Sequence, residues 1–158
     1  AIPAGERPDQ RRRLIRLVDR IQIGAAADQQ IDDVGVAVIR GRMQAGLAAF
    51  EDSEADALLF SNVLHQESAQ VCRSMLHRAW QALRPGGTLL VQGYFLAEDR
   101  RAPQFTTLHN LSALALWDGG RSWTVGDMQA QIAAAGFERQ AVLRQESSGF
   151  CLLSAVKV

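Results

Sequence analysis

Two uninterrupted apolar runs dominate the middle of the chain, and a segment of a different period lies between them. The runs occupy 57–65 (ALLFSNVLH) and 88–96 (TLLVQGYFL), and such runs are typical of parallel strands that are buried on both faces. Between them, apolar side chains recur every three or four positions, which predicts a helix over 68–83. The members of this stripe are Cys72, Met75, Leu76, Ala79, Trp80 and Leu83.

Short connections join these three segments. Arg84-Pro85-Gly86-Gly87 ends the helix, because proline cannot continue a helix and glycine permits the turn that follows. A strand, a helix and a second strand with short joints predict a right-handed βαβ unit whose two strands are parallel.

Upstream of this unit the pattern predicts two further strands. VGVAVIRG (34–41) is rich in Val and Ile and bounded by glycine, which is typical of a buried strand. RIQI (20–23) is short and β-prone. A weakly helical stretch separates the two, so the alternation of strand and helix begins before residue 57.

Downstream of the unit, FTTLHNLSALALW (105–117) is predicted to be helical, and DGGRSW breaks that helix. Thr124 followed by Asp127 matches an N-cap box for a further helix, which ends at Gly136. The chain closes with ERQAVLRQ and GFCLLSAVKV, which are predicted to be two strands joined in a hairpin by ESSG.

This order of elements predicts one α/β domain over residues 1–158, with a largely parallel sheet and an antiparallel pair of strands at its C-terminal end. The length fits one domain of ordinary size with a real hydrophobic core. No internal repeat and no low-complexity linker divides the chain.

The composition gives no support for a nucleic-acid or membrane partner. Lys plus Arg and Asp plus Glu number 17 each, so the net charge is zero and no basic surface is expected. No apolar run is long enough to span a bilayer, and no signal-peptide pattern opens the chain. We therefore expect a cytoplasmic protein.

The two cysteines, Cys72 and Cys151, have no spacing typical of metal ligands. We interpret them as small core residues rather than as a disulfide. We predict no metal site.

Four short motifs follow one another in order along the chain. They are Leu64-His65, Leu83-Arg84-Pro85-Gly86-Gly87, Gly120-Arg121-Ser122-Trp123-Thr124 and Ala135-Gly136-Phe137, and GVAVIRGRM (35–43) precedes them. This ordered set resembles the C-terminal two-thirds of S-adenosylmethionine (SAM)-dependent O-methyltransferases of the small-molecule type. That family includes caffeic acid O-methyltransferase and bacterial antibiotic O-methyltransferases. The resemblance covers roughly residues 20–158.

The resemblance implies a Rossmann-like class I methyltransferase sheet, mostly parallel with an antiparallel C-terminal hairpin. In this family a glycine-rich loop after the first strand approaches the cofactor, and a helical dimerisation domain precedes the core. The sequence carries neither. Either the first strand and the loop lie before Ala1, or the start of the chain has diverged from the family. We expect a homodimer if the upstream domain is present.

The resemblance also implies the residues of a site. His65 matches the family's catalytic histidine, which removes the proton of the acceptor hydroxyl, a role that suits a side chain with a pKa near neutrality. The resemblance implies SAM as the cofactor and a small-molecule acceptor as the partner. The positions implied for cofactor contacts are Gln22, Arg42, Met43 and Asn62, and those implied for the acceptor are His109 and Asn110.

Around this site the chain departs from the family pattern. Arg42 replaces an acidic residue, and Gln66 follows the histidine where the family has Asp. Gly93 and Ser122 stand where plant members carry the two acids that orient the histidine. His65 is therefore either a working base or a hydrogen-bonded structural histidine.

Two functions follow from these observations. The favoured one is SAM-dependent methyl transfer to a hydroxyl group of an aromatic or polyketide-like small molecule. The alternative is a catalytically silent methyltransferase-like domain that acts as a binding or interaction module. A fold that binds the cofactor and performs other chemistry also stays open.

Several other aromatic side chains allow two interpretations. Phe105, Trp117 and Trp123 are pocket walls or, as we expect, ordinary core residues. His77 lies on a charged helix surface and is expected to be solvated.

Overall fold

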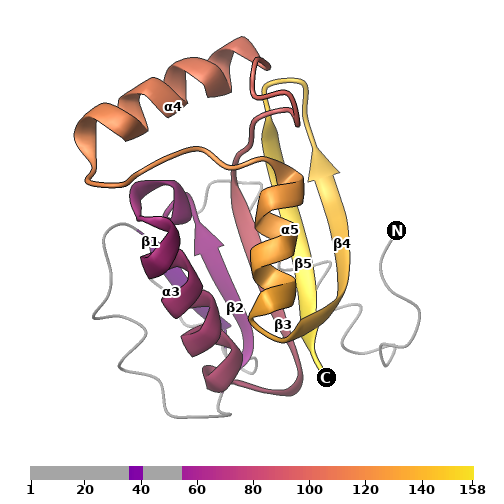
Figure 1. Ribbon diagram of the computed structural model, residues 1–158. Helices are drawn as coiled ribbons and strands as arrows, with labels where there is room; N and C mark the ends of the chain where they lie inside the picture. The colour runs from indigo at the N-terminus through magenta and orange to yellow at the C-terminus, as the bar shows by residue number, and fades with distance from the viewer. Residues whose placement is uncertain (1–35, 41–54) are drawn as a thin grey trace.

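The computed structural model describes residues 36–40 and 55–158 (Figure 1). The strands of this part of the chain form one sheet in the order β1-β2-β3-β5-β4. They are β1 (Val36–Arg40), β2 (Ala55–Ser61), β3 (Leu83–Tyr94), β4 (Phe137–Gln145) and β5 (Phe150–Lys157). β1, β2 and β3 are parallel, whereas β5 runs antiparallel to both β3 and β4. The predicted sheet is confirmed.

Helix α3 (Ala69–Ala82) joins β2 to β3 as the βαβ pattern predicts. It begins after Ser68, whose hydroxyl accepts a hydrogen bond from the Val71 N–H at 3.3 Å. It ends earlier than predicted, because Leu83 is extended and pairs with Ala55. The cause is Pro85, which cannot continue the helix and drives the residue before it towards extended conformations.

The C-terminal half also follows its prediction. Helix α5 (Val125–Ala134) begins at a capping box, in which the Thr124 hydroxyl accepts from the Asp127 N–H at 3.0 Å and the Asp127 carboxylate accepts from the Thr124 N–H at 3.1 Å. Helix α4 (Gln104–Leu116) confirms the helix predicted over 105–117. Backbone hydrogen bonds from Glu146 to Phe150 and from Gly149 to Glu146 close the predicted hairpin between β4 and β5.

The hydrophobic core lies between the sheet and two helices, α3 and α5, which cover the same face in Figure 1. Every second side chain along the strands faces these helices, among them Leu58, Phe60, Leu89, Val91, Cys151 and Leu153. The alternate side chains, which point to the opposite face of the sheet, are buried as well, such as Leu59, Leu90 and Leu152. Burial on both faces explains why the strands read as continuous apolar runs. Cys72 and Cys151 are buried free thiols, as predicted.

A buried lysine ties the elements together at the end of the sheet where β3 begins. The Lys157 Nζ donates to the Leu83 carbonyl at 2.6 Å and lies 4.2 Å from the centroid of the Trp80 ring. The Trp80 indole in turn donates to the Gly136 carbonyl at 3.1 Å. A buried ammonium group is costly unless it has hydrogen-bonding or cation–π partners. We therefore interpret the contacts of Lys157 and Trp80 as structural.

The predictions upstream of residue 57 are tested only in part. β1 confirms the strand predicted over 34–41, whereas the strand predicted over 20–23 lies outside the described residues. None of the helices in the described part of the chain is long and apolar enough to cross a membrane.

Candidate active site

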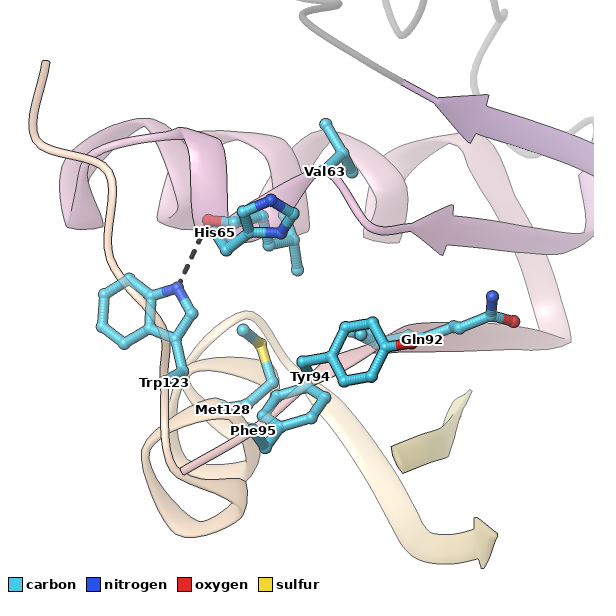
Figure 2. A pocket seen from close by; sticks show the side chains of 10 residues that line it. Val63, His65, Gln92, Tyr94, Phe95, Trp123 and Met128 are labelled. Atoms are coloured by element: carbon cyan, nitrogen blue, oxygen red, sulfur yellow. Dashed lines mark hydrogen bonds between the residues drawn. The ribbon is translucent and has the colours of Figure 1, made fainter. Parts of the chain in front are cut away.

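The candidate site lies at the carboxyl ends of β2 and β3, where α4 extends across the end of the sheet (Figure 1). Open α/β sheets bind their ligands at this edge. A small pocket of about 20 Å³ opens here, enough for one water-sized group. Its polar lining includes His65, Gln92 and Tyr94, and its apolar lining includes Phe95, Trp123 and Met128 (Figure 2).

The sequence predicts that His65 ends the strand, but in the structure His65 lies in the turn beyond it. β2 ends at Ser61, and Asn62 takes a left-handed backbone conformation with φ 53°. The Asn62 N–H still donates to the Gln92 carbonyl at 3.0 Å, but its conformation cannot continue an extended strand. The chain therefore turns, and His65 falls in the single 3-10 turn η1 (Leu64–Gln66).

Hydrogen bonds from the 120–124 segment hold this turn in place. The Arg121 N–H donates to the His65 carbonyl at 2.9 Å. The Trp123 indole N–H donates to the Leu64 carbonyl at 3.3 Å, which is the dashed line in Figure 2. The motif Gly120–Thr124 therefore acts on the histidine through the backbone of η1.

The imidazole of His65 is buried against two aromatic rings. The ring centroid of His109 lies 4.5 Å away at an interplanar angle of 65°, and that of Trp117 lies 5.4 Å away at 75°. Burial lowers the pKa of His65 from 6.5 to about 4, and the charge of a protonated His109 contributes to the same shift. His65 is therefore neutral at neutral pH, which is the form that accepts a proton, but a pKa of about 4 makes it a weaker base than an imidazole that titrates near neutrality.

This shift predicts that the folded protein loses stability as the pH falls from about 6.5 to about 4. Over this interval the unfolded chain binds a proton at His65 and the folded protein does not, so acid favours unfolding. We expect the free energy of unfolding, measured by urea denaturation at several pH values, to fall more steeply in the wild type than in a His65→Phe variant. Equal pH dependence in the two proteins would contradict burial of a neutral imidazole.

Both predicted acceptor residues lie on α4 close to this turn. His109 is half-buried, and its ring lies 5.8 Å from that of Tyr94 in addition to its contact with His65. Its Nδ1 atom is buried without a hydrogen-bond partner among the described residues. The Asn110 side-chain oxygen accepts from the Ser122 N–H at 2.7 Å, so Asn110 ties α4 to the 120–124 segment. Contact with an acceptor stays a prediction for both residues.

No carboxylate in the described part of the chain contributes to the pKa of His65. Gly93 lines the pocket without a side chain, and Ser122 is buried with no hydrogen-bond partner for its hydroxyl oxygen among the residues that the structure describes. As the sequence indicates, Gly93 and Ser122 supply no acid to orient the histidine, and the rings of His109 and Trp117 contact His65 instead.

Three buried side-chain oxygens near this edge lack hydrogen-bond partners within the described ranges, namely Asn62 Oδ1, Gln92 Oε1 and Ser122 Oγ. Buried polar atoms are normally paired, so each is available to a donor from a ligand. Asn62 is one of the residues implied for cofactor contact, and that contact stays a prediction. The other implied cofactor residues, Gln22, Arg42 and Met43, lie outside the described residues.

Sequence reasoning missed Tyr94 and Gln92 as pocket residues. Their position at the carboxyl end of a strand that neighbours β2 was the available signal, because such ends form sites in parallel sheets. Met128 also lines the pocket, although its helical spacing indicated only core packing.

The three aromatic residues expected in the core divide into different environments. Trp123 is a buried core residue, as expected, and Trp117 is half-buried against His65. For Phe105 the expectation is wrong, because its side chain is 53% exposed and contacts Tyr94 with ring centroids 4.8 Å apart. It opens α4, which buries only Thr106 and Ala113. His77 is exposed, as expected.

The fold and the histidine at its carboxyl edge define a Rossmann-like methyltransferase class of domain. A family model of the O-methyltransferase domain matches residues 21–138. The chain therefore belongs to the O-methyltransferase domain family, which confirms the resemblance drawn from its motifs.

Individual relatives agree with this assignment. Acetylserotonin O-methyltransferase of Gallus gallus is 36% identical over 97 residues, which are 60% of this chain and 28% of that protein. The tetracenomycin polyketide synthesis 8-O-methyl transferase TcmO of Streptomyces glaucescens is 31% identical over 83 residues, covering 52% and 24% of the two chains. The chain thus spans about a quarter of the length of these curated relatives.

The fold is also found in a solved relative. The crystal structure of human N-acetylserotonin methyltransferase in complex with SAM superposes with a TM-score of 0.63 and 27% sequence identity. The match covers 73% of this chain and 33% of the human one. The predicted fold class is confirmed.

Proposed function

We propose that this chain is part of the catalytic core of a SAM-dependent O-methyltransferase that methylates a hydroxyl group of an aromatic or polyketide-like small molecule. The observation that carries the proposal is His65, a buried and neutral imidazole beside a pocket at the carboxyl edge of an O-methyltransferase-family sheet. The relatives named for acetylserotonin and for tetracenomycin support this class of acceptor.

In this proposal His65 is the general base. Its neutral imidazole takes the proton of the acceptor hydroxyl as the oxygen gains the methyl group, and the proton then passes to water. The pocket has room for one water-sized group, so we assign it to the acceptor hydroxyl, and the rings of Tyr94, Phe95 and Trp123 that line it suit contact with a planar acceptor. The remaining task of these residues is to hold the acceptor oxygen in line for transfer, because proximity supplies much of the rate.

Asn62 is the described residue that would hold the cofactor, through its buried and unpaired Oδ1. When bound, SAM supplies a methyl group that is already activated by its sulfonium. Gln22, Arg42 and Met43 are proposed as further contacts on the strength of their motif positions. The alternative of a catalytically silent domain gains no support from the relatives, which are named as methyltransferases.

The test uses the intact protein that contains this chain. Calorimetric titration with S-adenosylhomocysteine should give saturable binding, and labelled SAM should transfer its methyl group to the oxygen of a hydroxyindole or of a polyketide-derived phenol. Asn62→Gly should weaken the binding, because glycine accepts φ 53° and only the side-chain amide is lost. Exposed His77 on α3 provides a control, since His77→Ala should bind normally.

Two outcomes count against the proposal. Absence of S-adenosylhomocysteine binding at millimolar concentration would overturn it. Binding without transfer to any hydroxyl acceptor would favour the silent domain instead.

A further inference from the structure

A catalytic base needs a neighbour that holds its ring in a productive orientation, and a hydrogen-bonded third group usually does this. Among the described residues, His65 has no carboxylate that acts on its imidazole. Its near neighbours are the rings of His109 and Trp117, which meet it edge-to-face with ring centroids 4.5 Å and 5.4 Å away. Edge-to-face packing at these distances is an attractive contact with a defined geometry.

We propose that His109 is the positioning residue of His65, holding the imidazole of the base by ring contact from α4 in place of an acidic partner. The base role rests on the proposed function, whereas the pairing of the two rings is a feature of the fold alone. His109 thus acts through His65 and is not itself the proton acceptor.

His109 can position another ring because it is itself held. Tyr94 of β3 and Phe105 of α4 flank its imidazole, with ring centroids 5.8 Å and 6.5 Å away. Two hydrogen bonds anchor α4 on either side of it. They run from the Ser122 N–H to Asn110 Oδ1 at 2.7 Å and from the Thr106 hydroxyl to the Ser148 carbonyl at 3.0 Å. The backbone of His109 is therefore fixed beside His65, and the rings of Tyr94 and Phe105 limit how its imidazole can turn.

The two imidazoles also influence each other's charge. Burial lowers the pKa of both, and a protonated His109 lowers the pKa of His65 further. A proton on His109 therefore opposes a proton on His65. The pair holds the base in its proton-accepting form over a wide pH range.

Within residues 36–40 and 55–158, no other titratable or charged group contributes to the pKa shift of His65. Tyr94 of β3 faces His109, while the Arg121 guanidinium lies over the Trp123 ring, 5.4 Å from its centroid. Glu67, just after η1, acts on Cys72. None of the three contributes to the pKa shift of His65, whose causes are burial and His109.

Two substitutions separate ring contact from charge. His109→Phe keeps an aromatic ring and removes the charge, and His109→Ala removes both. NMR titration of the intact protein with ring-labelled histidine should show the pKa of His65 rising above about 4 in His109→Phe but staying below 6.5, because burial persists. His109→Ala should raise it further, because water then reaches the ring.

The kinetic readout is the pH profile of kcat. Its acid limb should move with the pKa of His65 in both variants. At neutral pH, loss of the ring in His109→Ala should lower kcat on the order of tenfold to a hundredfold, the effect of a small misplacement, while His109→Phe should restore most of it. His77→Phe on the exposed face of α3 is the matched control and should change neither quantity.

The outcomes distinguish this inference from the proposed function. An unchanged His65 pKa in both His109 variants would overturn the pairing, whether or not the protein is active. A shifted pKa with an unchanged kcat in His109→Ala would overturn the positioning role. A shifted pKa in a protein that binds no S-adenosylhomocysteine would support the pairing while the proposed function fails.

Discussion

Replacement of His65 by alanine is expected to lower kcat for methyl transfer by about 10²- to 10⁴-fold, the usual contribution of a positioned general base. The affinity for S-adenosylhomocysteine should stay within a few-fold of the wild type, because the proposed cofactor contact is Asn62 and not the imidazole. Steady-state kinetics with labelled SAM and calorimetry on the same preparation measure the two quantities separately.

The acceptor offers an internal control for this prediction. A phenol that is already ionised at the assay pH needs no base, so the loss of rate should shrink as the acceptor becomes more acidic. His77→Ala should keep full activity, because this side chain is exposed and hydrogen-bonds with Gln81 at 3.4 Å. If His65→Ala loses less than about tenfold with a weakly acidic phenol, His65 is a structural histidine.

Most of the fold could be predicted because local patterns and tertiary structure agree. The three-and-four stripe from Cys72 onward predicts α3, and Thr124 with Asp127 predicts the capping box that begins α5. Prediction failed at Leu83, because an apolar residue suits the end of a buried helix and the start of a buried strand equally well. Pro85 decides between them, and its effect reaches further back than the pattern indicates.

The site was predictable in its position and much less in its contacts. Leu64-His65 follows a strand in a known motif, so the sequence identifies the histidine and the edge of the sheet. The contact of His65 with His109 and Trp117 depends on where α4 lies across that edge. Hydrogen bonds between distant segments, such as Thr106 to Ser148, set this placement. The hydrophobic pattern within one segment gives no information about hydrogen bonds to a distant segment, so these contacts could not be predicted.

Gly149→Ala is expected to destabilise the protein by about 2–5 kcal/mol, the sum of a left-handed backbone and an overpacked contact. Gly149 lies in the β4–β5 hairpin with φ +91°, a conformation that alanine rarely adopts. A Cβ atom at this position would overlap the Thr106 hydroxyl and would stand 2.7 Å from the Phe95 carbonyl oxygen and 2.8 Å from Pro103 Cγ. Thr106 and the Phe95 backbone are buried and cannot move aside at low cost.

Gly86→Ala supplies the matched comparison, because Gly86 has φ +79° but a Cβ there would meet no atom within 4 Å. It should lose about 1–2 kcal/mol from the backbone alone, so the difference between the two variants in urea denaturation isolates the packing term. The overlap also affects the site, because Pro103 and Thr106 lie at the start of α4 and Phe95 directly follows β3. We expect Gly149→Ala to displace α4, separate His109 from His65, lower kcat and raise KM for the acceptor, whereas Gly86→Ala should leave both kinetic constants unchanged. Equal stability losses and equal KM values in the two variants would show that the hairpin does not hold α4 over the candidate site.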